Sequence, residues 1–379
     1  MLTAGRAAPL FWSILFWPST IAASGAALVI PDQSLSPLQS VLAPISFSSS
    51  GQAVGALQFD LVWSSSLDLH VATGSTIGAS SKILYTNWLA PQTLRCVIAG
   101  LNSAPLLEGE ILRLFITASP TASPGAAEIA VTNIVAAALD GAPVPADSFF
   151  AAVQISGEPT SQRFLQTAGI LNAASLQPGP LAPGEIFTLL GLIPQGNLTL
   201  TINGQQAPLL YQDAHQVNAV VPFTLDPSIN ATVELQSEQG SVTLTVPTAL
   251  AAPAIFTQNA TGVGPGAILN EDYTPNSDTS PAARDSILMI FATGFGPLQW
   301  LPVDGQAIPS AVPTVLPVTA TIGNLPAEVL YAGSAPTLVA GVMQINVRVP
   351  KDLPPNPETP VSLTAGGIPV PLGVTVAIQ

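Results

Sequence analysis

The stretch HQVNAVVP, residues 215–222, recurs almost unchanged as MQINVRVP at residues 343–350. In the first copy Val217, Ala219 and Val221 alternate with the side chains between them, which is the period-two pattern of a half-buried β-strand. Both copies end in proline, and proline ends a strand because it has no N–H to donate to the neighbouring strand. The repeated phrase therefore predicts that one β-strand unit occurs twice in this chain.

The duplication extends outward from this phrase in both directions. The matching segments are LNAASLQPGPLAPGEIFTLLG (171–191) with LNEDYTPNSDTSPAARDSILMIFATGFG (269–296), TINGQQAPLLY (201–211) with TIGNLPAEVLY (321–331), and ATVELQSEQGSVTLTV (231–246) with PVSLTAGGIPVPLGVTV (360–376). They follow one another in the same order in both copies. We therefore expect two tandem β-sandwich repeats, at residues 169–258 and 259–379.

Within the repeats, INGQQA and IGNLPA place Asn and Gly at expected hairpin turns, where positive φ is cheap for these residues. The paired Gln and Asn of the repeated strand could hold a ligand. Short amides commonly satisfy backbone groups at strand ends, so we favour a structural role. The second copy also carries an eight-residue insertion, giving the longer loop AGSAPTLVAGV (332–342), and we expect this loop to be exposed with no core-forming need.

Composition favours an all-β protein with several domains. The chain has 379 residues, of which 48% are apolar and only 8% charged, with 38 prolines and 30 glycines. Short β-branched runs broken by Pro, Gly, Asn and Asp recur, and no window has the side-chain spacing of a long helix. Disorder is the alternative for a chain rich in Pro and Gly, but the apolar content and the regular alternation argue against it.

The charge balance excludes one class of partner. The formal net charge is −14, and the only lysines are Lys82 and Lys351. A nucleic-acid-binding protein needs a basic surface, which this composition cannot supply, so no nucleic-acid partner is expected. Anionic membrane surfaces are disfavoured for the same reason.

The N-terminus has the order of an export signal. Arg6 is followed by the apolar run APLFWSILFW (8–17) and by the small residues ASGAA (23–27). Pro18 and the polar residues after it interrupt the apolar run before it reaches the roughly 20 residues of a membrane span. We predict a signal peptide over residues 1–26, no membrane span after its cleavage, and a secreted or cell-surface location. An uncleaved anchor is the alternative.

Catalytic and metal sites find little support in the sequence. Cys96 is the only cysteine, so no internal disulfide can form, and we expect a buried structural thiol. The two histidines, His70 and His215, fall in different expected domains, and neither a nucleophile set nor a zinc site can be assembled from them. Glu108 and Glu110 share one face at a strand start, where solvated carboxylates are expected rather than a glycosidase pair.

Weaker candidates for ligand binding remain. The loop NEDYTPNSD (270–278) offers Glu271, Asp272 and Asp278 to Ca²⁺, although its spacing fits no EF-hand and a solvated turn is favoured. Trp63 and Trp88 could stack on sugars; alternation puts Trp63 in the core and leaves Trp88 open. Sequons occur at the following positions: Asn197, Asn230 and Asn259. We assign no catalytic, cofactor-binding or metal-binding residue, expect no cofactor, and leave the ligand-binding residues unassigned.

Several motifs of the repeats carry a family resemblance. They are GILNAASLQPGPLAPGEIFTLLG, PAIFTQNATGVGPGAILN, AARDSILMIFATGFGPL, VDGQ and VLYAGSAPTLVAGVMQINVRVP. Over residues 169–379 they resemble the acidobacterial, or Solibacter, C-terminal domain family, although LLGLIPQG in the first copy lacks that family's longer G-x-G-L turn. The resemblance implies an exported bacterial protein with two immunoglobulin-like modules of the IPT/TIG kind, and no established activity.

The segment before the repeats has a different pattern. In order along residues 28–156 come ALQFDLVW, IAGLN, EGEILRLF and IAVTNIVA, which together resemble a cohesin domain. The chain departs from that family at SSS (64–66), where cohesins commonly carry Asp-Pro. The resemblance implies a jelly-roll sandwich related to carbohydrate-binding modules; dockerin binding is implied for cellulosomal members only. Polar, turn-rich residues 157–168 are expected to form the linker to the repeats.

Together these patterns predict a non-enzymatic, exported binding or scaffolding protein. A cohesin-like domain would recognise an extracellular protein, such as a dockerin-like partner, or a polysaccharide. The immunoglobulin-like repeats would act as a stalk or surface-attachment module, with the loop at 332–342 as a second contact surface. The alternative function is an accessory component or enzyme of extracellular polysaccharide degradation, and an enzyme would need a deep cleft with two converging carboxylates or a carboxylate and a histidine.

Overall fold

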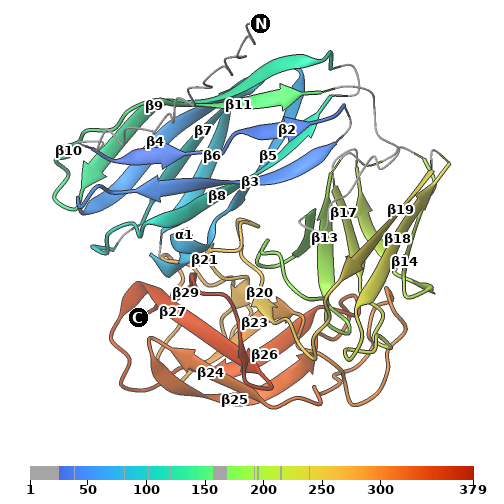
Figure 1. Ribbon diagram of the computed structural model, residues 1–379. Helices are drawn as coiled ribbons and strands as arrows, with labels where there is room; N and C mark the ends of the chain where they lie inside the picture. Colours follow the sequence, from blue (N-terminus) through green and yellow to red (C-terminus); the bar gives the residue numbers. More distant parts are fainter. Residues whose placement is uncertain are drawn as a thin grey trace, which may run out of the picture.

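The computed structural model describes residues 25–379 apart from 38, 81, 101, 120–121, 157–168, 192, 194–195, 214–215 and 239 (Figure 1). The expected signal peptide lies outside the described residues except for its last two, and the expected linker and His215 lie outside them entirely. Within the described chain the only α-helix is the short α1 (Ser75–Ala79), and the other named elements are strands. The all-β prediction is confirmed.

The first domain is a sandwich of two sheets with the core between them. The smaller sheet has the order β1–β3–β8–β5, formed by β1 (Ala27–Val29), β3 (Ser40–Ser48), β8 (Gly109–Ala118) and β5 (Leu67–Thr73). The larger sheet has the order β2–β11–β9–β4–β7–β6 with β10 beside β9, formed by β2 (Gln33–Leu35), β11 (Phe149–Ile155), β9 (Gly125–Ala138), β4 (Val54–Trp63), β7 (Thr93–Ala99), β6 (Ile83–Ala90) and β10 (Pro143–Val144). Because successive side chains of a strand alternate, Leu57, Phe59 and Leu61 of β4 all point into this core.

The second domain contains the first copy of the repeat. One sheet has the order β12–β13–β17–β16, formed by β12 (Ile170–Asn172), β13 (Ile186–Leu190), β17 (Gln216–Val220) and β16 (Leu209–Gln212). The other has the order β15–β14–β18–β19, formed by β15 (Gln205–Gln206), β14 (Leu198–Ile202), β18 (Ala231–Ser237) and β19 (Gly240–Val246). The alternation of the repeated strand places Val217 and Ala219 in the core between the two sheets, where both are fully buried.

The third domain contains the second copy, and it begins before the expected boundary at residues 258 and 259, because β20 (Ala254–Ile255) pairs with a strand of this domain. Its strands follow the order β20–β23–β26–β25–β24–β27–β29–β21, with β22 beside β23 and β28 beside β27. The strands are β20 (Ala254–Ile255), β21 (Gly264–Pro265), β22 (Ile268–Leu269), β23 (Ile287–Thr293), β24 (Val318–Ile322), β25 (Leu325–Ser334), β26 (Met343–Arg348), β27 (Asn356–Ala365), β28 (Ile368–Pro369) and β29 (Val374–Ile378). Strand β25 is long enough to pair with both β24 and β26, so it joins the two halves of the sheet.

The two copies pair their strands in the same register. Tyr211 of β16 lies opposite Asn218 of β17, and Tyr331 of β25 lies opposite Asn346 of β26. In both copies a β-bulge falls just before the tyrosine. A shared bulge at a shared position indicates that the doubled phrase encodes one strand pair built twice.

The amides of the repeated strand have the structural role that the sequence favoured. Gln216 Nε2 donates to Asn218 Oδ1 at 2.7 Å, and Gln344 Nε2 donates to Asn346 Oδ1 at 2.9 Å. The same bond in both copies ties neighbouring outward-facing residues of one strand. These amides therefore stabilise the strand.

The hairpin turns also follow the sequence. Asn203 and Gly204 have φ of 52° and 78°, and Gly323 and Asn324 have φ of 57° and 66°. Both pairs therefore occupy the left-handed region, with the order of Asn and Gly reversed between the copies. Asn and Gly are the residues that adopt this conformation most readily, so their order can change without changing the turn.

The insertion in the second copy differs from expectation. Ala335 and Ala340 are 1% and 0% exposed, so residues 332–342 do contribute to the core. The carbonyl of Gly341 accepts a hydrogen bond from Thr293 Oγ1 at 2.8 Å, and within the loop only Thr337 and Leu338 are exposed. The insertion has no counterpart in the first copy, and so a comparison of the two copies could not indicate what it packs against.

The first and third domains are in direct contact (Figure 1). Val263 of the third domain is 3% exposed and belongs to the apolar core of the first. Thr73 Oγ1 donates to the carbonyl of Thr261, and Gly78 of α1 lies against Gly373 so closely that a Cβ on Gly373 would be 2.3 Å from the Gly78 Cα. The two domains therefore share buried surface.

The second domain contacts both of the others. Asn172 Nδ2 donates to the Ala252 carbonyl at 2.9 Å, and the Ile186 N–H donates to Thr293 Oγ1 at 2.8 Å, across the boundary with the third domain. Toward the first domain, Arg113 Nη1 donates to the Leu176 carbonyl at 3.4 Å. Each domain therefore touches the other two.

Candidate functional site

One sheet face of the first domain is not covered by the sandwich partner. We call it the outer face, and define it by the β4, β6, β7, β9 and β11 side chains that point away from the smaller sheet: Gln58, Asp60, Val62, Tyr85, Asn87, Arg95, Val97, Thr132, Val135 and Phe150. Tyr85, Val135 and Phe150 are 55%, 58% and 58% exposed. Large apolar side chains from three strands therefore reach solvent on one surface.

A charged cluster lies at the centre of the outer face. Arg95 binds Asp60 with two hydrogen bonds, from Nε to Oδ1 at 2.8 Å and from Nη2 to Oδ2 at 2.9 Å. Asn133 Nδ2 donates to the same carboxylate at 2.8 Å, from a residue whose φ is 51°. The hydrogen bonds from Arg95 hold the pKa of Asp60 below its usual value, against the opposing effect of burial. The guanidinium is thereby held in one orientation on a face that also carries exposed apolar side chains.

Trp88 extends beyond the outer face at the edge of the sandwich. Its side chain lies on the inner side of edge strand β6, as its pairing with buried Leu94 shows, yet it is 60% exposed. It contacts buried Trp63 edge-on, with ring centroids 5.7 Å apart and planes at 67°. Trp63 is in the core, as predicted. Its contact positions the ring of Trp88, whose location the sequence did not predict.

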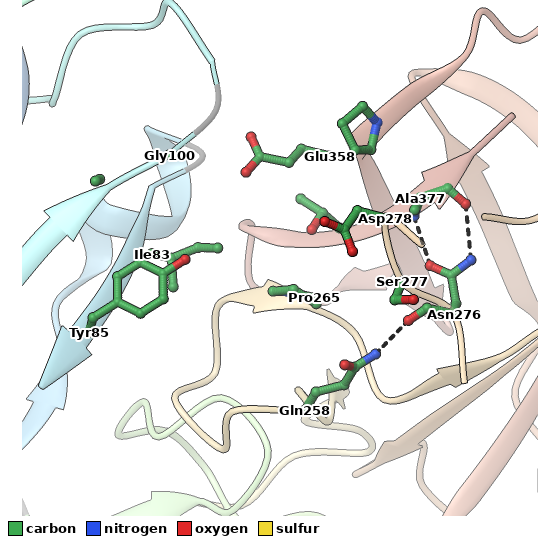
Figure 2. Close-up of a pocket in the computed structure, with 13 residues that line it drawn as sticks. Ile83, Tyr85, Gly100, Gln258, Pro265, Asn276, Ser277, Asp278, Glu358 and Ala377 are labelled. Carbon is green, nitrogen blue, oxygen red and sulfur yellow. Dashed lines mark hydrogen bonds between the residues drawn. The ribbon is translucent and has the colours of Figure 1, made fainter. Parts of the chain in front are cut away.

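A pocket of about 410 Å³ opens between the first and third domains (Figure 2). Tyr85 and Ile83 of β6 form one wall, and the opposite side carries Asp278 and Glu358 of the third domain. The other residues that line the pocket are Ala99, Gly100, Gln258, Pro265, Asn276, Ser277, Pro357, Thr375 and Ala377. Since Tyr85 belongs to both, the pocket is continuous with one end of the outer face.

Beside this pocket lies a buried lysine. Lys82 is 1% exposed, and its Nζ donates to Oδ1 of Asn102 at 3.0 Å and to the carbonyl of Asn102 at 3.3 Å. Burial lowers the pKa of Lys82, and the negative charge of Glu358 partly opposes that shift. Lys82 therefore links the end of β6 electrostatically to the third domain.

The acidic residues singled out in the sequence do not form a catalytic or metal site together. Glu108 accepts hydrogen bonds from the Ser49 N–H and hydroxyl, at 2.8 and 2.7 Å, whereas Glu110 pairs with Arg113. The serine bonds lower the pKa of Glu108. Each carboxylate thus has its own structural partner in the protein, whereas a solvated pair was expected.

The carboxylates of the loop at 270–278 also point to different places. Glu271 and Asp272 line a shallow depression away from the domain boundary, whereas Asp278 lines the interdomain pocket. Asp272 accepts bonds from the N–H and hydroxyl of Thr274, at 3.0 and 2.6 Å. Among the described residues no group of three or more His, Cys, Asp or Glu side chains converges as a metal site.

A buried carboxyl group lies at the boundary of the second and third domains. Glu185 is 1% exposed; its Oε2 accepts from the Ala182 N–H, and its Oε1 accepts from Asn172 Nδ2, both at 2.9 Å. Burial raises the pKa of Glu185 to about 8 against these two bonds. It does not line the interdomain pocket, and both of its oxygens are bonded within the protein, so it is a structural group whose protonation state affects folding.

Cys96 gives a direct test of core burial. The thiol is 0% exposed, and burial raises its pKa to about 12. Because the thiolate is the reactive form, we expect no reaction with Ellman's reagent in the native protein and one equivalent of reaction in denaturant. Rapid reaction under native conditions would contradict the placement of β7 in the sandwich core.

Sequence reasoning missed Arg95, Tyr85 and Glu358 as candidate site residues. The alternation around Cys96 is a signal that Arg95 points outward, but nothing local signals its pairing with Asp60 or the bond from Asn133 to that carboxylate. Tyr85 and Glu358 come together only through domain packing, and no spacing along the chain signals that contact.

No helix in the described part of the chain is long and apolar enough to cross a membrane.

No protein-family model and no curated protein matches this chain. Several solved cohesin modules are similar in structure to part of it. The sixth cohesin of Acetivibrio cellulolyticus scaffoldin B, solved in complex with a Cel5 dockerin, is 18% identical, with a TM-score of 0.32 over 35% of this chain and 99% of that one. A non-cellulosomal cohesin from Archaeoglobus fulgidus is 13% identical, with a TM-score of 0.31 over 35% of this chain and 92% of that one.

A third similar structure is the cohesin module of a family 33 glycoside hydrolase from Clostridium perfringens. It is 13% identical, with a TM-score of 0.31 over 36% of this chain and 99% of that one. At these identities and TM-scores the likeness says nothing about what the chain binds. The resemblance of residues 169–379 to the Solibacter C-terminal domain family stays a prediction.

Proposed function

We propose that the protein is a non-catalytic, exported binding module whose first domain holds a protein partner on the outer face. One observation carries the proposal: the exposed apolar side chains of Tyr85, Val135 and Phe150 surround the ordered pair of Arg95 and Asp60. Aromatic and arginine side chains on a flat, partly desolvated surface are typical of the centres of protein interfaces. The resemblance of residues 28–156 to cohesins points to the same domain.

A protein partner is favoured over a polysaccharide by the layout of the face. Sugar-binding surfaces present aromatic rings as neighbouring platforms, but Tyr85 is on β6 and Phe150 on β11, with three strands between them. Trp88 is on the opposite side of β6. The apolar contacts are therefore spread across the whole sheet, which suits a broad protein surface.

An enzyme is disfavoured, although the interdomain pocket brings two carboxylates to one cavity. A glycosidase general acid is held in apolar burial, which keeps it protonated at working pH. Asp278 is exposed on its loop, and Glu358 is beside the buried ammonium of Lys82. Neither environment is of that kind. The attachment role of the repeats and the export of the protein stay predictions.

The proposal is tested by variants of the outer face in the full chain. Val135→Ser and Phe150→Ser change exposed side chains, so the fold should persist. Leu301→Ser in the third domain is a control of matched exposure, since Leu301 and Phe150 are both 58% exposed. Each protein is immobilised, and a fraction of exported proteins is passed over it. We expect the wild type and the control to retain protein from that fraction, and we expect the retained amount to fall about tenfold or more with the double variant.

Other outcomes of the same experiment decide against the proposal. Equal retention by the wild type and the double variant would move the binding surface elsewhere on the molecule. Binding on a glycan array with no protein retained would favour a polysaccharide partner. Hydrolysis of a polysaccharide panel that is abolished by Asp278→Asn would show that the protein is an enzyme of polysaccharide degradation.

A further inference from the structure

The interdomain pocket has a composition that selects one kind of ligand. Its walls are largely apolar, with Ile83, Pro265 and Pro357 among them, and the ring of Tyr85 stands on one side (Figure 2). Asp278 and Glu358 add carboxylates from the third domain. The cavity therefore offers an apolar channel with negative charge at its polar side.

The side-chain amides of the pocket are already occupied by the protein itself. Gln258 Nε2 donates to the carbonyls of Gly266 and Asn276, at 3.0 and 2.8 Å. Asn276 Nδ2 donates to Asn270 Oδ1 and to the Ala377 carbonyl, both at 2.9 Å, and its Oδ1 accepts from the Ala377 N–H at 2.8 Å. The amides thus act as scaffolding, and the charged side chains of the lining are the carboxylates Asp278 and Glu358, beside the hydroxyl groups of Tyr85, Ser277 and Thr375.

A lining whose charged groups are all carboxylates disfavours anions. An anion needs donors or positive charge, and no Lys, Arg or His side chain among the described residues lines this pocket. Lys82, which interacts electrostatically with Glu358, is buried and bonded to Asn102. A cationic group needs only hydrogen-bond acceptors, and an aliphatic stem attached to it can pack against the apolar walls.

The two carboxylates of the pocket differ in how far a nearby cation offsets their negative charge. Lys82 acts on Glu358, so part of the negative charge of Glu358 is already offset. Asp278 has no salt bridge among the described residues. Asp278 is therefore the group whose charge is most available to an incoming cation, and Tyr85 can add a cation–π contact from the other side.

We propose that this pocket receives a lysine or arginine side chain of the protein partner. The inference rests on the proposed function, because Tyr85 belongs both to the outer face and to the pocket wall. A partner seated on the outer face therefore has the pocket at one end of its footprint. The first and third domains act together in recognition, and the third domain supplies the charge selectivity.

The test uses small probes, so that it does not depend on finding the partner. Nα-acetyl-arginine N-methylamide is titrated into the full chain by ligand-observed NMR, beside the citrulline analogue, which has nearly the same shape and no charge. We expect the arginine probe to bind with a millimolar dissociation constant and the citrulline probe to bind at least fivefold more weakly. Raising the salt concentration should weaken only the arginine probe.

Two variants localise the effect. Asp278→Asn should weaken the arginine probe about fivefold, whereas Asp272→Asn, six residues away in the same loop but outside the pocket, should leave it unchanged. Equal binding of both probes, no binding of either, or equal losses in the two variants would overturn the pocket inference. Val135→Ser and Phe150→Ser should not affect the probe, so failure here and failure of the outer-face proposal remain distinguishable.

Discussion

Replacing Glu185 with glutamine should remove most of the decline in stability that we expect between pH 4.5 and pH 8. The folded-state pKa is raised by burial to about 8, whereas the unfolded-state pKa is near 4.5. The unfolded chain therefore loses this proton at a lower pH than the folded protein does. The stabilisation is complete below pH 4.5 and is lost as the pH rises through 8, and a shift of this size corresponds to roughly 4–5 kcal/mol.

Glutamine is neutral at every pH, so the variant should be more stable than the wild type at pH 8. Below pH 4.5 the order should reverse, because glutamine has one oxygen and cannot accept from both Ala182 and Asn172, a loss of about 1 kcal/mol. The measurement is urea denaturation from pH 4 to 9, with hydrogen exchange of β13 and β17 to localise the effect. Glu238→Gln, at an exposed turn of the same domain, is the control.

Parallel stability curves for Glu185→Gln and the wild type would show that this carboxyl is not the source of the pH dependence. A parallel change in the Glu238→Gln control would assign the effect to net charge instead. With the control flat and the variant crossing the wild type, the boundary of the second and third domains would be the part of the fold most sensitive to alkaline pH.

Replacing Gly78 with alanine should separate the first domain from the third. A Cβ at Gly78 would lie 2.3 Å from the carbonyl oxygen of Leu372, a contact that requires backbone to move. Overpacking of this kind costs about 1–3 kcal/mol. We expect a lower unfolding midpoint, a larger radius of gyration in solution scattering, and faster hydrogen exchange around Val263, which the first domain buries.

Gly179→Ala is the matched control, because a Cβ at Gly179 would have no neighbour within 4 Å. That variant should keep the midpoint and the dimensions of the wild type. A Gly78→Ala protein with unchanged scattering and unchanged exchange at Val263 would contradict the docked arrangement. It would also remove the interdomain pocket as a site, since Tyr85 and Asp278 meet only when the two domains are docked.

The sequence by itself determined the strands, their faces and their repetition. The alternation of Val217, Ala219 and Val221 predicted their burial, and all three are 0% exposed, but Val220, which the same alternation places on the opposite face, is also 0% exposed. This succeeds because a strand has a fixed period of two, so a buried face leaves its mark on consecutive residues. The Asn and Gly turns succeeded for a similar reason: the left-handed conformation restricts the residue type locally.

Only the tertiary structure decided where the chain could recognise a partner. Tyr85, Asp278 and Glu358 line one cavity although they are far apart along the chain. Asp60 likewise binds Arg95 and Asn133, which lie on the two strands beside its own. The insertion at 332–342, expected at the surface, is largely buried for the same reason. Contacts between domains and between distant strands depend on the shapes of finished surfaces, and such surfaces leave no period in the sequence that forms them.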